Sequence, residues 1–425
     1  MQPVATNVSE PKRIEPEGQR PFSFGRLFAG TWLSYTSYGI LLAVLPLAEL
    51  SEGGGPILAT LVIGAPLLAQ TISSWGWGWL ADRTGARRGP LVLAAVLQAP
   101  LFAVLPLVGP VDLFLLRIVQ SSLFGAVVLA TTQATEDARA SAAFRLGRLQ
   151  LAQNGGMLLG VAASFPFLIG SSFRLSSGGG WELSVLLAFF TVLAGIVFAS
   201  AGDLRRDVPS VARTRFAPSS HPGVFRLAGA TAAVSTARYI AVTAIPVYLA
   251  TTLGKEGFFG IPANTTAQLA IWVAVSSATN LVASPLSGRW AETSATRHRS
   301  LLAFSLVYVA IWVLIAVVPT YAVVFATWCL PVAVFFTVAG VREAAYWSGP
   351  SERGRAVGAL TAAFTLGGLL GGAAAGILLA IEIPAPTVFL IAAIGSLGAA
   401  LLFVPGFGFI PGPREPPRVD PKSSS

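Results

Sequence analysis

Long apolar blocks recur along the whole chain of 425 residues, and each holds about 18 to 25 residues. A helix of that length spans the ~30 Å hydrocarbon layer of a bilayer, because each residue adds ~1.5 Å. Only 11% of the residues are charged, against roughly 25% in a soluble protein, so the chain has too little charge to cover a surface in water. The sequence therefore predicts an all-α membrane protein that crosses the bilayer many times.

The apolar blocks predict twelve transmembrane helices in two pseudo-symmetric six-helix bundles. The expected spans are 24–48, 56–79, 90–108, 111–134, 149–169, 182–201, 227–250, 266–288, 300–318, 321–341, 356–380 and 387–405. The longest polar segment between spans separates the sixth from the seventh. The predicted organisation is a tail at 1–21, a first bundle at 22–201, a central loop at 202–226, a second bundle at 227–406 and a tail at 407–425.

The 28 Lys and Arg residues are distributed unevenly about these spans. Most lie in the two tails, the central loop and the other segments on the same side, whereas the opposite side holds only Arg174 and Lys255. The positive-inside rule then places both termini in the cytoplasm of a multi-pass protein in a cell membrane, either plasma or inner. The net charge of +9 is explained by this asymmetry, so we expect no nucleic-acid partner. The expected partners are membrane lipid and a small-molecule substrate.

The chain lacks the residue patterns of a metal centre or of an enzyme. Its single cysteine, Cys329, excludes an intramolecular disulfide, and the two histidines, His221 and His298, lie far from it in the sequence. No HExxH, GxSxG or phosphate-binding-loop motif is present. We therefore expect no cofactor, no metal and no enzymatic activity. The protein is expected to be a monomer.

An internal repeat supports the division into two halves. Thr36 and Pro46 in the first span recur as Thr236 and Pro246 in the seventh. A second set, in and after the second and eighth spans, pairs Gly78, Ala81 and Asp82 with Gly288, Ala291 and Glu292. Duplicated halves that rock about a shared site are typical of secondary transporters, and they favour a transporter over a passive channel.

Charged residues follow three tryptophans in the stretch WGWGWLADRTGARRG, residues 75–89. The tryptophans are expected at the membrane interface, and the arginines on the cytoplasmic side. Asp82 would lie at the partially negative end of its own helix, so it requires a partner on a neighbouring helix. Gly78 would permit close helix approach, and Gly85 would permit a turn with positive φ.

The segment GWLADRTGARRG resembles the signature between spans two and three of the major facilitator superfamily. The resemblance extends to the twelve spans, the six-plus-six division and the basic central loop. It implies transport by alternating access, with Asp82 holding the two halves together on the cytoplasmic side when the site faces outward. The residues of this conformational latch would be Gly78, Asp82, Arg83, Gly85, Arg87 and, in the second half, Glu292.

Two arginines are predicted inside spans, where a charge is costly and usually faces a protein interior or a cavity. Arg238 lies ~18 Å into the ~30 Å layer, and Arg117 lies ~7 to 8 Å from the outer interface. Arg238 occupies the repeat position of Tyr38, so both halves are expected to contribute to one cavity. The candidate substrate-binding or coupling residues are Arg238, Arg117, Gln120, Tyr35, Tyr38 and Asn280.

The segment LLRIVQSSLFGA, residues 115–126, is similar to the fourth-span pattern of proton-coupled drug exporters, in which an arginine and a glutamine serve coupling. This resemblance favours proton-coupled export of small amphipathic or drug-like solutes. The alternative is an organic-anion porter that uses Arg238 and Arg117 as counter-charges, because no Asp or Glu lies in the middle of a span to pair with them. Gly156 and Gly160 in the fifth span, and the three glycines at 368, 372 and 376, are interpreted as helix-packing residues.

Overall fold

The computed structural model describes residues 22–84, 86–136, 142–168, 178–202, 222–256, 265–293, 297–347 and 353–404. Within these ranges the chain is helical and contains no strand. The two predicted tails, most of the predicted central loop and Gly85 lie outside the described residues.

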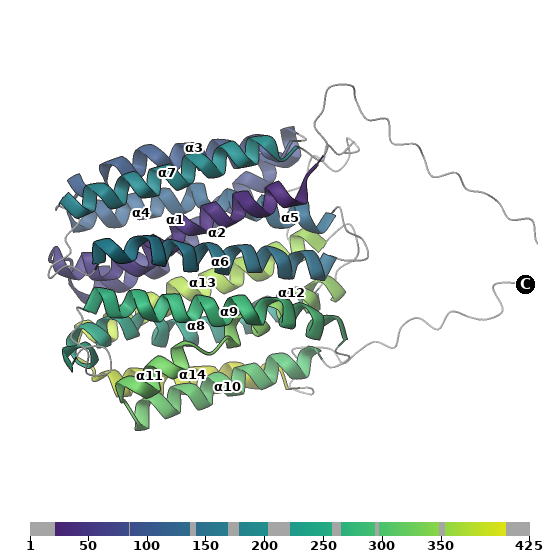
Figure 1. Ribbon diagram of the computed structural model, residues 1–425. Coiled ribbons are helices and arrows are strands. Elements are labelled where there is room, and N and C mark those ends of the chain that lie inside the picture. Colours follow the sequence, from purple (N-terminus) through teal and green to yellow (C-terminus); the bar gives the residue numbers. More distant parts are fainter. Residues whose placement is uncertain are drawn as a thin grey trace, which may run out of the picture.

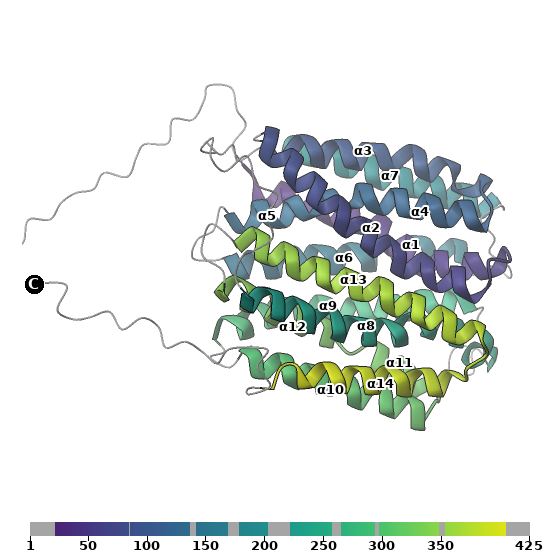
Figure 2. The same cartoon turned by 180° about the vertical axis from the view of Figure 1, so that it is seen from behind.

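The helices form two halves, which lie one above the other in Figure 1 and in the reverse view of Figure 2. The first half contains α1 (Phe24–Ser51), α2 (Gly55–Thr84), α3 (Arg88–Val104), η1 (Leu105–Leu107), α4 (Pro110–Phe124), η2 (Gly125–Val127), α5 (Val128–Glu136), α6 (Ala142–Leu168) and α7 (Gly178–Ser200). The second half contains α8 (Pro222–Thr251), η4 (Leu253–Glu256), α9 (Thr265–Thr293), α10 (Arg297–Val317), α11 (Tyr321–Trp328), α12 (Val332–Trp347), α13 (Arg353–Ala380) and α14 (Ala385–Leu401).

Each of the twelve expected spans coincides with a helix or with consecutive helices, so the predicted fold class is confirmed. In the described residues, ten helical segments are long and apolar enough to cross a membrane. Of the other two spans, α6 is more polar and α14 is a shorter apolar helix. Several helices extend past the expected bounds, as α8 does by beginning at Pro222 within the predicted loop, because hydropathy marks only the apolar part of a helix.

Two spans are interrupted, and side chains of neighbouring helices donate hydrogen bonds to backbone carbonyl groups at the interruptions. The fourth span passes through η2, where the hydroxyl of Ser74 donates to the carbonyl oxygen of Gly125 at 3.0 Å. The tenth span breaks between α11 and α12, where Thr279 of α9 donates to the carbonyl oxygen of Cys329 at 2.6 Å. Such pairing is required in an apolar layer, which offers no water to a free carbonyl.

The internal repeat is visible in the packing of α1 on α6 and of α8 on α13. A side chain at Gly160 would collide with the carbonyl oxygen of Thr36, and one at Gly371 would collide with that of Thr236. Both threonine hydroxyls donate to the carbonyl oxygen four residues earlier, at 3.0 Å and 2.9 Å. The predicted repeat therefore corresponds to equivalent glycine-mediated helix contacts, which confirms the packing role of Gly160.

The two halves meet along α2 with α13 and along α6 with α9. On α2, a Cβ at Gly64 would lie 2.9 Å from the carbonyl oxygen of Gly368, so both helices need glycine to approach this closely. Further along the same pair, the hydroxyls of Thr71 and Thr365 form a hydrogen bond. Between α6 and α9, the amide of Asn154 donates to the hydroxyl of Ser284 at 3.0 Å.

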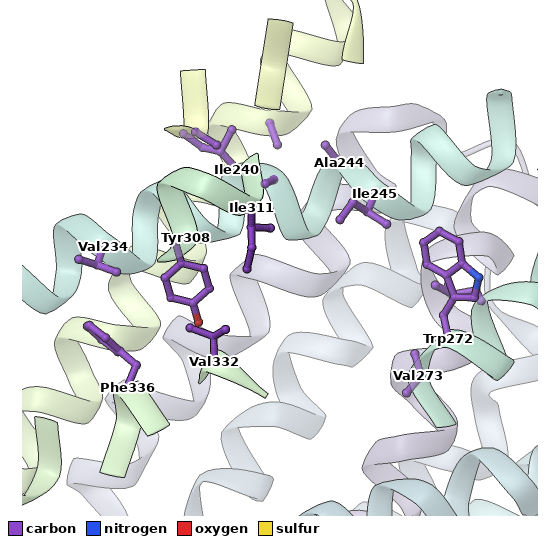
Figure 3. Close-up of a cluster of buried hydrophobic side chains, with 14 of the residues drawn as sticks. Val234, Ile240, Ala244, Ile245, Trp272, Val273, Tyr308, Ile311, Val332 and Phe336 are labelled. Carbon is purple, nitrogen blue, oxygen red and sulfur yellow. The ribbon is translucent and has the colours of Figure 1, made fainter. Parts of the chain in front are cut away.

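Apolar side chains fill the interior of each half. In the second half, Figure 3 shows Tyr308 of α10 beside Val332 and Phe336 of α12. The rings of Tyr308 and Phe336 lie 6.4 Å apart, and those of Tyr308 and Trp312 stack at 5.9 Å. This packing fixes α10 and α12 relative to α8, the helix that carries Arg238.

Candidate functional site

Arg117 of α4 is buried and forms the centre of a hydrogen-bonded cluster in the first half. Its guanidinium donates to the side-chain oxygen of Gln120 and, at 2.9 Å, to the hydroxyl of Ser121. Gln120 in turn donates to the side-chain oxygen of Gln98 on α3 at 2.6 Å. Because Arg117 and Gln120 are three residues apart, the helix itself places both on one face.

Aromatic rings from α1 cover this cluster. The guanidinium of Arg117 lies 5.2 Å from the ring centre of Tyr38, close enough for a cation–π interaction. Tyr38 stacks on Phe124 at 5.0 Å, and Tyr35 meets the same phenylalanine edge-on at 5.1 Å. The predicted residues Tyr35, Tyr38, Arg117 and Gln120 are therefore brought together.

A small cavity opens beside Arg117. Its polar wall is formed by Arg117 and Tyr38, and its remaining lining comes from apolar residues of α1 and α2, namely Leu41, Leu42, Leu45, Pro46, Val62 and Ile63. In this structure the cavity has room for about one water molecule, so an anion would meet this cation, this phenol and these apolar walls only after the cavity widens.

Arg238 of α8 lies near the middle of a helix of 30 residues, as the sequence predicts. Three rings surround its guanidinium, with centroids at 5.1 Å for Tyr239, 5.5 Å for Phe364 of α13 and 6.0 Å for Tyr308 of α10. Tyr239 and Phe364 also meet edge-on at 6.1 Å. Each half thus holds one guanidinium against aromatic rings.

The two aromatic clusters approach one another where the halves meet. The helices that carry Tyr38 and Tyr239, α1 and α8, contact one another. A Cβ at Gly368 of α13 would lie 3.5 Å from the ring of Tyr239, which places this ring at the contact with α2. Arg117, Tyr38, Tyr239 and Arg238 therefore form a series that runs from one half into the other.

Asn280 of α9 lies in a separate polar cluster. Its amide nitrogen donates to the hydroxyl of Ser276 at 3.5 Å, and its side-chain oxygen is buried without a hydrogen-bond partner. Its backbone carbonyl accepts a hydrogen bond of 2.7 Å from Ser284, the residue that also bonds Asn154 across the interface. In the described part of the chain, Asn280 does not contact Arg117 or Arg238, and its bonds place it beside the contact between the halves.

The predicted latch can be followed only in part. Asp82 and Glu292 lie in the last turns of α2 and α9, but their side chains, like the whole of Gly85, lie outside the described structure. Among the described residues, a Cβ at Gly78 would meet no atom within 4 Å, so the close helix approach expected of this glycine is not found there.

Of the two latch arginines, Arg83 lies in the last turn of α2 and Arg87 lies just before α3. The guanidinium of Arg83 lies 5.2 Å from the ring centre of Trp79, and Arg87 is the N-cap residue of α3. Trp75 and Trp79 are exposed, as expected of an interfacial belt, whereas the indole of Trp77 turns inward and donates to the carbonyl oxygen of Ser122 at 2.8 Å.

Sequence reasoning missed several residues of the two clusters. Gln98 carried a usable signal, because an amide in an otherwise apolar span requires a partner. Tyr239, Tyr308 and Phe364 carried none, since aromatic residues in membrane spans are common and only the tertiary structure brings these three to Arg238.

Buried carboxylates are a second omission of the sequence reading. Among the described residues, only Glu49 and Glu343 are buried acids, and Glu343 accepts a hydrogen bond of 2.9 Å from the indole of Trp347. Glu49 lies near the end of α1, where its sequence position suggested nothing more than the outer boundary of a span.

The second half of the chain matches a known protein family. Residues 227–425 match the family model described as Major Facilitator Superfamily. No curated protein matches the chain in sequence.

Solved transporter structures share the fold over nearly the whole chain. The human organic anion transporter MFSD10 (TETRAN) is 16% identical, with a TM-score of 0.68 over 90% of this chain and 98% of that one. A POT family transporter solved with a thioalcohol-conjugated peptide is 11% identical, with a TM-score of 0.72 over 89% and 94%. The Escherichia coli fucose:proton symporter FucP is 14% identical, with a TM-score of 0.58 over 89% and 97%.

Proposed function

We propose that this protein is a secondary active transporter that works by alternating access and carries amphipathic organic anions. The two halves would rock about the series of residues between Arg117 and Arg238, exposing it first to one side of the membrane and then to the other. Fold likeness and the family match of the second half support the transporter class. The choice of substrate class rests on the site itself.

The observation that carries the proposal is the pair of guanidinium groups, one in each half, held without a carboxylate. Among the described residues, Arg117 contacts amide, hydroxyl and aromatic groups, and Arg238 contacts three aromatic side chains. A charge held inside a membrane protein is expensive and normally acquires a counter-charge. A carboxylate or similar anionic group on the substrate would supply it, in the bidentate geometry that a guanidinium favours.

The surroundings of the two arginines fit a substrate that is also apolar. Tyr38, Phe124, Tyr239 and Phe364 offer ring faces, and the cavity beside Arg117 has mainly aliphatic walls. An anion with an aromatic or aliphatic body would meet both features. The organic anion transporter among the similar structures is consistent with this substrate class.

The membrane orientation is part of the same proposal. We infer that both termini are cytoplasmic, in a plasma or inner membrane, from the uneven distribution of the basic residues. Asp82 would hold the halves together on that side when the site faces outward, and protons would be the coupling ion. The transporter would act as a monomer.

A second candidate function, proton-coupled export of neutral or cationic drug-like solutes, is favoured by one observation. Arg117 and Gln120 do bond to one another, as the likeness to the exporter pattern would require if they act as a unit in coupling. In that case Arg117 would serve coupling, and the aromatic rings alone would contact the substrate.

The test is uptake by proteoliposomes that contain the purified full-length chain. Radiolabelled p-aminohippurate serves as the aromatic carboxylate, its neutral amide as the matched solute, and tetraphenylphosphonium as the lipophilic cation. We expect wild-type protein to carry the carboxylate in preference to the other two, and the double variant Arg117→Met and Arg238→Met to lose this uptake.

The matched control is Arg226→Met, which removes an exposed arginine near the N-terminal end of α8, the helix that also carries Arg238. This variant should transport at the wild-type rate. The exporter would replace the anion proposal if two results came together. Wild-type protein would take up none of the carboxylate, and the double variant would still take up tetraphenylphosphonium or the amide.

A further inference from the structure

Glu49 is a fully buried acid that the site described above does not use. It lies in the last turn of α1, where its side chain is 0% exposed. Among the described residues, neither carboxyl oxygen has a hydrogen-bond partner. A buried acid normally receives donors or a cation, because removing an ionised carboxylate from water without compensation costs several kcal/mol.

The turn between α1 and α2 covers this carboxyl group. The turn has the sequence Glu52, Gly53, Gly54 and Gly55, and its first and last glycines adopt positive φ values of 89° and 69°. The backbone nitrogen of Gly54 donates to the carbonyl oxygen of Glu49 at 2.7 Å. The turn therefore folds back over the end of α1.

Gly54 shows how closely the turn approaches the acid. A Cβ at this position would lie 2.6 Å from Oε2 of Glu49 and 3.2 Å from Cβ of Pro110 at the start of α4. Only glycine fits there without displacing a neighbour. A turn of three consecutive glycines also has few side-chain contacts to hold it, so it can open at a small energetic cost.

No charged or titratable group of the described residues, on α1 or on the helices packed against it, interacts with the Glu49 carboxyl group. The other acids with described side chains at this end of the bundle are Glu52 in the turn, Asp112 on α4, Glu182 on α7 and Glu382 after α13, and the last three are exposed. Burial under the turn therefore favours the neutral, protonated form of the Glu49 carboxyl group. It can release that proton when water reaches it.

We propose that Glu49, covered by the Gly53 to Gly55 turn, is the proton-binding site through which the transporter couples substrate movement to the proton gradient. This inference rests on the proposed function, and it identifies the group that takes up the coupling proton. Arg117 and Arg238 cannot serve, because a guanidinium stays protonated in proteins. Glu343, the other buried acid of the described chain, already accepts a hydrogen bond.

The step is a proton transfer alone. A proton from water on the side of the α1–α2 turn binds one carboxylate oxygen of Glu49, and the neutral acid can then be covered. Rocking of the halves would uncover it toward the other side, where the proton returns to water and the anionic carboxylate is restored. The substrate anion and the proton would cross in the same cycle.

The experiment separates coupling from substrate movement in proteoliposomes that hold the full-length chain. Counterflow of radiolabelled p-aminohippurate needs no net proton movement, whereas accumulation driven by a pH gradient does. With one proton per anion, a gradient of about one pH unit supports about tenfold accumulation. We expect Glu49→Gln to retain counterflow and to lose this accumulation, and Glu49→Asp to retain both.

Glu182→Gln is the matched control, because it removes an exposed acid at the same end of the bundle. It should accumulate p-aminohippurate as the wild type does. Accumulation by Glu49→Gln equal to that of the control would overturn the proton-site proposal. Absence of counterflow and of accumulation in wild type, for every anion tried, would instead refute the proposed function.

A second measurement needs no variant and decides the matter if Glu49→Gln does not fold. Dicyclohexylcarbodiimide, an apolar reagent that modifies protonated carboxyl groups, is added to wild-type proteoliposomes, and the modified peptides are identified by mass spectrometry. Gradient-driven accumulation should be lost in proportion to modification of Glu49. Loss of accumulation with Glu49 unmodified, or full modification of Glu49 with accumulation intact, contradicts the proposal.

Discussion

Replacing Arg238 by methionine should separate binding from stability, because the guanidinium has aromatic partners and, among the described residues, no carboxylate partner. Methionine keeps a long side chain and removes the charge. The variant is destabilised by the loss of cation–π interactions worth about 0.5 to 2 kcal/mol. It is stabilised in turn because it no longer holds a cation away from water. We therefore expect the free energy of unfolding without ligand to change by less than about 2 kcal/mol.

The bound state should respond very differently. A hydrogen bond to a charged group contributes about 1.5 to 3 kcal/mol, so an anion that pairs with Arg238 should bind the variant about 10- to 150-fold more weakly. Ligand at about 100 times its Kd stabilises wild-type protein by about 2.7 kcal/mol. If the Kd rises about 100-fold, the same concentration stabilises the variant by only about 0.4 kcal/mol.

The assay is thermal unfolding of the purified protein in detergent, followed by the fluorescence of its 10 tryptophans, with and without p-aminohippurate. Wild-type protein should show a ligand-induced rise in Tm, and Arg238→Met should show almost none while its Tm without ligand stays close to that of wild type. The opposite pattern, a large fall in Tm without ligand and an unchanged ligand-induced rise, would identify Arg238 as a structural residue and refute the reasoning.

Three further substitutions test the packing and the polar contacts. Gly160→Ala should lower the free energy of unfolding by about 1 to 3 kcal/mol, because its methyl group would collide with α1. Its control is Gly78→Ala, which should leave the Tm unchanged in thermal unfolding, because no described atom lies within 4 Å of the added methyl group. Asn154→Ala removes a hydrogen bond between the halves worth about 1 kcal/mol, so the labelling of cysteines introduced on the cytoplasmic side should rise about fivefold. Unchanged labelling would show that this bond does not affect the equilibrium between the inward-facing and outward-facing states. Gln98→Leu leaves the amide of Gln120 unpaired and should cost about 1 to 3 kcal/mol, and an unchanged Tm would show that the amide finds another partner.

Much of the fold could be predicted because a bilayer imposes a strict length on each span. Apolar blocks of sufficient length located all twelve spans, and the threonines and prolines at 36, 46, 236 and 246 revealed the duplication. Helix ends were less predictable, since helices such as α2 and α8 continue into the polar layer, where hydropathy gives no signal.

The candidate site was predictable in its charges and not in its surroundings. Arg117 and Arg238 were evident because an embedded charge is rare, and the pairing of Gln120 with Arg117 was implied by the resemblance to the exporter pattern. Asn280 was predicted for the same site, but it lies with the polar residues of α9 at the contact with α6. An amide in a span signals a need for a hydrogen bond and does not say which helix supplies it.

By itself, the sequence determined the number and order of the membrane helices, their division into two halves and the presence of two buried cations. These properties depend on composition and spacing along the chain, because the thickness of the bilayer sets the length of each span and an embedded charge is costly. Only the tertiary structure decided that three rings from α8, α10 and α13 surround Arg238 and that a glycine turn covers Glu49. Such contacts join residues far apart in the chain or placed by a turn, and they depend on how helices pack, which local spacing does not encode.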